Sequence, residues 1–97
     1  MAFVRPIAKS VEYVGHHGFA VTIYIDDLPA EALAFASITQ IDTSGQPILG
    51  SAITTVNNVV PQVGSVTVRG EINWQFDLHV RVSVLAIPPD YRFGQSA

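Results

Sequence analysis

The sequence contains no cysteine. Disulfide frameworks, thiolate metal sites and thiol nucleophiles are therefore excluded, and stability has to come from packing and backbone pairing. No stretch reaches the roughly 18 consecutive apolar residues of a membrane-spanning helix, and the first residues lack the apolar run of a secretory signal. If Met1 is the natural start of the chain, the sequence predicts a cytoplasmic protein.

Charged residues are also scarce. They make up 13% of the 97 residues, whereas hydrophobic residues reach 48%; soluble domains usually carry about 25% charged residues. With only five Lys and Arg and a net charge of -3, the chain offers no basic surface for phosphates, so we expect no nucleic-acid partner. Uncharged polar residues, or a partner that hides apolar surface, must cover the molecule. We therefore predict a homo-oligomer, most simply a dimer.

From residue 66 to residue 87 every second residue is apolar or glycine, and up to Ser83 the residues between them are polar. This period of two is typical of β-strands that are buried on one face. The apolar positions are Val66, Val68, Gly70, Ile72, Trp74, Phe76, Leu78, Val80, Val82, Val84 and Ala86. One straight strand of this length would extend about 70 Å, which is too long for so small a protein. Gly70 is the flexible point in the run, and we predict the break there.

The apolar register also predicts the core. Ile72, Trp74, Phe76 and the apolar positions that follow should point into the protein, and Trp74 should be largely buried. Phe19 and Phe35 lie in apolar registers of other predicted strands, so we expect them in the core as well.

Turn signals divide the remaining chain. Pro6 places a strand over Phe3–Ala8 at a sheet edge, and Gly15–Gly18 predicts a β-hairpin with a four-residue loop. The segment from Leu33 onward fits a strand, with a helical turn near Pro29 as the alternative for residues 29–36. Asp42–Pro47 is a strong turn. The strand, turn and strand around it resemble those of bacterial immunoglobulin-like modules, and we transfer no function on that pattern.

Together these segments predict an all-β fold. About seven short strands, each apolar on one face, indicate a small antiparallel β-sandwich that is immunoglobulin-like or similar. A small open β-barrel is the alternative. We expect one domain over residues 1–97, with a core over 1–87 and a C-terminal tail over 88–97.

The candidate ligand-binding residues form two groups. Asp77, His79 and Arg81 alternate along one strand, each about 7 Å from the next, so they could grip a small molecule such as a sugar or carboxylate. His16 and His17 lie together in the glycine-flanked loop, but two adjacent imidazoles are too few for a specific metal site. We expect no metal, no cofactor and no enzymatic activity; His79 would be the only plausible base of an enzyme.

The polar face of the long alternation turns apolar at Leu85 and Ile87. These two residues are the candidate oligomer interface, unless Tyr91 and Phe93 of the tail fold back over them.

The sequence thus favours a non-catalytic binding or assembly module of unknown ligand that self-associates. The alternative is a small, pore-forming-like membrane-active β protein, because alternating strands can face lipid on one side and water on the other. We rank this membrane role lower, since every sandwich strand alternates.

Overall fold

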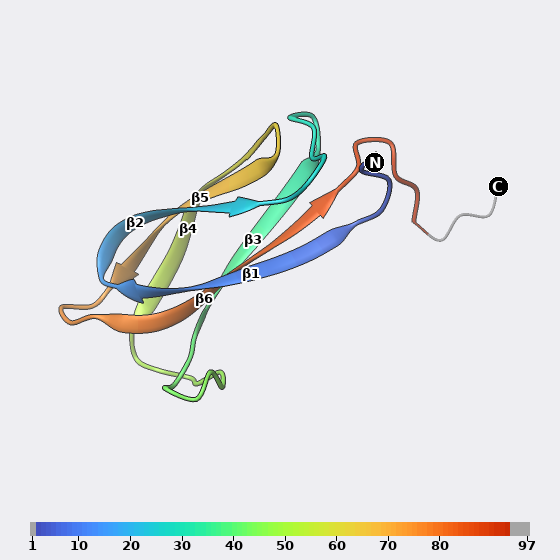
Figure 1. Ribbon diagram of the computed structural model, residues 1–97. Helices are drawn as coiled ribbons and strands as arrows, with labels where there is room; N and C mark the ends of the chain where they lie inside the picture. The colour runs from blue at the N-terminus through green and yellow to red at the C-terminus, as the bar shows by residue number, and fades with distance from the viewer. Residues whose placement is uncertain (1, 94–97) are drawn as a thin grey trace.

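The computed structural model describes residues 2–93, and it places six β-strands within them. The strands are β1 (Ile7–Gly15), β2 (His17–Tyr24), β3 (Leu33–Gln40), β4 (Ile53–Gln62), β5 (Ser65–Asn73) and β6 (Leu78–Ile87). They form two three-stranded antiparallel sheets with the orders β1-β6-β3 and β2-β5-β4. The chain passes between the sheets at every connection except β4 to β5, as its path in Figure 1 shows.

The predicted all-β antiparallel sandwich is confirmed, with six strands in place of about seven. The difference arises near the N-terminus. The predicted strand over Phe3–Ala8 and the first strand of the predicted hairpin are replaced there by the single strand β1. Lys9 and Ser10 continue the pairing with β6 opposite Val84 and Ser83, so β1 is unbroken. β1 is an edge strand, and Pro6 lies just before it.

The predicted hairpin over Gly15–Gly18 is wrong. β1 and β2 lie in different sheets, and the chain crosses from one to the other at His16, at the bend on the left of Figure 1. His17 adopts the left-handed conformation with a φ of 60°. Gly15 is buried, and a Cβ there would lie 2.6 Å from the Tyr13 hydroxyl. The glycine therefore provides space beneath the crossover instead of forming a tight turn.

The long alternating segment breaks at Trp74–Asp77 and not at Gly70. Gly70 lies inside β5, where a Cβ would come within 2.7 Å of the Thr55 carbonyl oxygen and 2.9 Å of the Phe19 ring. Close approach of a neighbouring strand and an aromatic ring is the reason for glycine at this position. The turn carries Trp74 and Phe76 out of the core, so their predicted burial is wrong: they are 38% and 67% exposed.

The core lies between the two central strands, β5 and β6. The prediction is confirmed for Ile72, Val80, Val82 and Val84, which are all buried, and Leu78 is half-buried. The remaining buried hydrophobic residues that pack with them are Phe19, Ile23, Ile25, Leu28, Ala32, Val66, Val68 and Ala86. The core is therefore aliphatic apart from Phe19.

The strand beginning at Leu33 is confirmed. Before it, the Ala32 N–H donates to the Pro29 carbonyl at 3.1 Å, which closes one turn, and residues 2–93 contain no helix. The predicted burial of Phe35 is wrong, because Ala34, Ala36 and Ile38 face the core and Phe35 points away from it.

Candidate binding surfaces

The outer face of the β2-β5-β4 sheet is polar along its central strand, whereas Tyr24, Ile53 and Val60 are exposed on its edge strands. The Thr22 and Thr67 hydroxyls lie 3.1 Å apart, and Thr67 Oγ1 donates to Gln62 Oε1 at 3.0 Å. Arg69 and Glu71 follow on the same face of β5. These polar groups need no further partner, because they bond to one another or to water.

The outer face of the β1-β6-β3 sheet carries an apolar patch, which consists of Leu33, Phe35 and Leu85. These side chains are 51%, 58% and 41% exposed. Phe35 of β3 lies directly opposite Leu85 of β6 in the antiparallel register. A hollow of about 230 Å³ lies beside this pair, and it is lined by Ala8, Phe35, Ala36, Ser37, Ser83, Val84 and Leu85.

A row of three serines with short side chains borders the apolar patch. Ser10, Ser83 and Ser37 occupy equivalent positions on the three strands, and the Ser10 and Ser83 hydroxyl oxygens lie 2.7 Å apart. Because these side chains are short, they leave Phe35 and Leu85 standing above the sheet. The apolar patch can therefore contact a flat partner surface.

The two sequence-predicted interface residues differ in accessibility. Leu85 belongs to the apolar patch, whereas Ile87 is only 6% exposed. The aromatic rings of Tyr91 and Phe93 contact each other at a centroid distance of 4.7 Å, and neither residue lines the hollow beside Leu85. Of the predicted tail, residues 94–97 lie outside the described residues.

The predicted row of Asp77, His79 and Arg81 does not act as one group. Asp77 lies on the turn before β6, and its Oδ1 atom is 2.6 Å from Nδ1 of His16. Arg81 donates from Nη2 to the Gly45 carbonyl at 2.7 Å. His79 is exposed on β6 opposite Val14 of β1, which offers it no polar side chain.

His16 and His17 contact each other edge to face, with ring centroids 4.7 Å apart. Together with Asp77 they mark one end of the sandwich, where Trp74 and Phe76 are also exposed. No group of three or more metal-ligating side chains occurs among residues 2–93. Sequence reasoning missed the pairing of His16 with Asp77, because no local signal connects residues so far apart in the chain.

The turn after β3 is tied to β6 through Arg81 and is built on one carboxylate. Asp42 Oδ1 accepts hydrogen bonds from the backbone N–H groups of Gln46 and Ser44, both at 2.9 Å, and from the Ser44 hydroxyl at 2.7 Å. These bonds, first the one from Gln46, lower the pKa of Asp42 below its ordinary value of 3.8. They favour the ionised form, and the turn is an ordinary structural turn.

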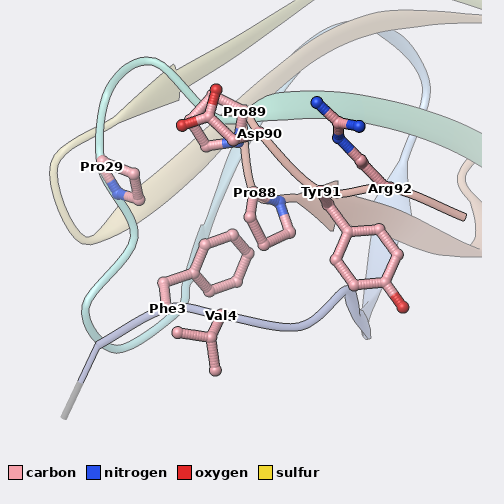
Figure 2. A pocket seen from close by; sticks show the side chains of 8 residues that line it. All are labelled: Phe3, Val4, Pro29, Pro88, Pro89, Asp90, Tyr91 and Arg92. Carbon is pink, nitrogen blue, oxygen red and sulfur yellow. The ribbon is translucent and has the colours of Figure 1, made fainter. Parts of the chain in front are cut away.

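A larger hollow of about 600 Å³ lies at the opposite end, where the N-terminal segment meets the residues after β6 (Figure 2). Its lining is mostly apolar and consists of Phe3, Val4, Pro29, Pro88, Pro89, Asp90, Tyr91 and Arg92. A second hollow of about 490 Å³ shares Phe3 and Val4 and extends toward Asp26 and Asp27. The sequence signal for this region was Pro88-Pro89, which indicates only the end of a strand.

Comparison of the chain with protein-family models, curated proteins and solved structures returns no match. Within residues 2–93 there is no helix with the length and hydrophobicity needed to cross a membrane.

Proposed function

We propose that this protein is a non-catalytic binding or assembly module that self-associates through the β1-β6-β3 sheet. The observation that carries this proposal is the contiguous apolar patch of Leu33, Phe35 and Leu85. The exposed apolar side chains on the outer face of the other sheet instead lie opposite polar residues. Contiguous exposed apolar side chains favour an interaction surface. Identical patches related by a two-fold axis can contact one another.

The low charge of the chain supports the same proposal. Charged residues keep the surfaces of small monomers apart, and only 13% of this chain is charged.

The non-catalytic part of the proposal rests on the separate partners of Asp77 and Arg81 and on the isolated position of His79. None of these three residues lines the three hollows described above.

Sedimentation velocity of two matched lysine variants tests the proposal. Leu85→Lys places a charge in the apolar patch, whereas Val60→Lys places one on the outer face of the other sheet; both side chains are 41% exposed in the unmodified protein. We expect the unmodified protein and Val60→Lys to sediment as dimers at micromolar concentration and Leu85→Lys to sediment as a monomer. A dimer that Leu85→Lys leaves intact would place the interface elsewhere.

A membrane-active role is the second candidate, and the exposed turn at Trp74 and Phe76 favours it. Aromatic side chains settle at the interface between water and lipid, and this turn presents two of them beside the uncharged Asn73 and Gln75. Dye release from liposomes tests this role. Leakage that Phe76→Ser abolishes would support it, and the absence of leakage at micromolar protein would remove it.

A further inference from the structure

Two of the four edge strands, β1 and β4, carry a feature that hinders pairing with another chain. In β1, Lys9 points to the inner face, opposite the buried Val84, and its ammonium donates to the Tyr24 carbonyl at the end of β2. The ladder of β4 is interrupted by an irregularity between Val56 and Asn58, and the strand also contains Pro61. Inward-pointing lysines, bulges and prolines all protect exposed strand edges.

Of the other two edge strands, β2 is covered by Lys9 only at its Tyr24 end, and β3 has none of these features. Its sequence over Leu33–Gln40 contains no charged residue and no proline, and its pairing with β6 runs without a register shift. An uncharged, regular edge strand is a template for another strand. The apolar patch adjoins this edge, because Leu33 and Phe35 belong to β3 itself.

The hydrogen bonds at the end of β3 identify which backbone groups face outward. The Ile41 N–H donates to His79 on the β6 side at 3.0 Å, whereas the Gln40 carbonyl accepts from Ile48 on the opposite side at 2.9 Å. Because these directions alternate along a strand, the N–H and C=O groups of Ala34, Ala36 and Ile38 also point away from β6. No strand within residues 2–93 pairs with them.

The inner-face side chains of β3 indicate that this edge is accessible. Ala34, Ala36 and Ile38 are only partly buried, whereas their partners on β6, such as Val82 and Val84, are buried. The edge of the sheet is therefore not covered by the neighbouring loop, which reaches only as far as Gln40.

We propose that β3 pairs antiparallel with β3 of a second copy across a two-fold axis at Ala36, which joins the two β1-β6-β3 sheets into one continuous sheet. This inference rests on the proposed self-association and names its interface. The axis places Ala36 opposite its own copy and Ala34 opposite Ile38 of the second copy. Each such pair exchanges two hydrogen bonds, so this register uses every outward backbone group of these residues.

A second copy is the occupant because β3 is complementary to itself. The strand has no charge to repel its copy, and the proposed register places Phe35 opposite Ser37, so that a large side chain faces a small one. The apolar patches of the two copies then adjoin on the same outer face. A two-fold pairing of β1 or β4 would instead meet Lys9 or the irregular ladder of β4.

A proline at position 36 tests the pairing by sedimentation velocity. Ala36→Pro removes an outward N–H that makes no ladder bond within the chain, so the fold should tolerate it, while the pairing loses its central hydrogen bonds. Ala20→Pro is the matched control. The Ile25 N–H donates to the Gly64 carbonyl on the β5 side, and backbone directions alternate along a strand, so the Ala20 N–H points away from β5 to the free edge of β2. We expect Ala36→Pro to be monomeric and Ala20→Pro to remain dimeric.

Cysteine cross-linking tests the register independently of how well the proline variants fold. The chain has no cysteine, so introduced thiols have no competing partner. In the proposed dimer, positions 35 and 37 form a pair with Cα atoms about 4.5 Å apart, within disulfide range. Mild oxidation of mixed Phe35→Cys and Ser37→Cys proteins should give a covalent heterodimer, and mixed Phe35→Cys and Thr22→Cys proteins should not.

The outcomes separate this inference from the proposed function. An unmodified protein that is strictly monomeric overturns both. A dimer that persists in Ala36→Pro and forms no 35–37 cross-link overturns β3 pairing and leaves self-association standing. We expect Ala36→Pro to lose the dimer, Ala20→Pro to keep it, and the cysteines at positions 35 and 37 to cross-link.

Discussion

The ammonium of Lys9 donates a hydrogen bond to the backbone carbonyl of Tyr24, which connects the edge strand of one sheet to the edge strand of the other. Lys9 occupies an inner-face position that would otherwise suit an apolar residue. The bond covers one carbonyl on the side of the sandwich where β1 and β2 have unpaired edges. Among the described strands, the edge of β3 has no such charged cover.

Replacing Lys9 should therefore create a second site of association. In Lys9→Met the inner face keeps its aliphatic chain, but the Tyr24 carbonyl and the adjacent edge lose their charged cover. We expect this variant to form species larger than the dimer, measured by light scattering at increasing concentration. Lys9→Arg keeps the charge and should behave like the unmodified protein; equal scattering from all three proteins would contradict a protective role.

Truncation of a core residue and of the exposed Phe76 should have very different effects on stability. Ile72 is fully buried, so Ile72→Ala should lower the free energy of unfolding by about 2–5 kcal/mol. Phe76 is largely exposed, so Phe76→Ala should change it by less than about 0.5 kcal/mol. Urea denaturation measures both values. A loss of several kcal/mol in Phe76→Ala would mean that the turn packs against the core.

Alanine substitutions at two glycines test the close packing of β5. In Gly70→Ala the new Cβ would meet the Thr55 carbonyl and the Phe19 ring, and we expect a destabilisation of about 1–3 kcal/mol. Gly18→Ala is the matched control within a strand, because no atom lies within 4 Å of the position its Cβ would take. Thermal unfolding should place Gly70→Ala clearly below Gly18→Ala, and similar midpoints would refute the packing argument.

The turn at Asp42 should contribute to stability in a pH-dependent way. The pKa of Asp42 is lowered in the folded protein, so its contribution is present above the ordinary value of 3.8 and is lost as the pH falls through the lowered pKa. Asp42→Asn keeps an acceptor oxygen but not the charge. We expect its melting temperature to lie below that of the unmodified protein at pH 7 and to converge with it below pH 3.8. A constant difference across this range would show that ionisation plays no part.

The sequence predicted the central strands because their burial is one-sided. In Val80, Val82 and Val84 the period of two coincides with the real strand, so the core positions follow directly. The same period continues through Trp74 and Phe76 although the chain turns there. Since this turn has neither glycine nor proline, the pattern contained no signal to end the strand. Gly70, which looked like a break, is required by packing.

The apolar patch was only partly predictable. Leu85 stood out because it interrupts a polar face, whereas β3 has apolar residues on both faces. Alternation alone does not tell which face of such a strand is inside, and Phe35 was therefore assigned to the wrong face. The contact of His16 with Asp77 depends on how the two sheet crossings meet, which is a property of the tertiary fold.

Sedimentation equilibrium of the unmodified protein over the micromolar range is the decisive test of self-association. If the β1-β6-β3 face and the β3 edge form a self-association surface, the measured mass should approach twice that of the chain and fall toward the monomer on dilution. A mass equal to one chain at every concentration would contradict the account.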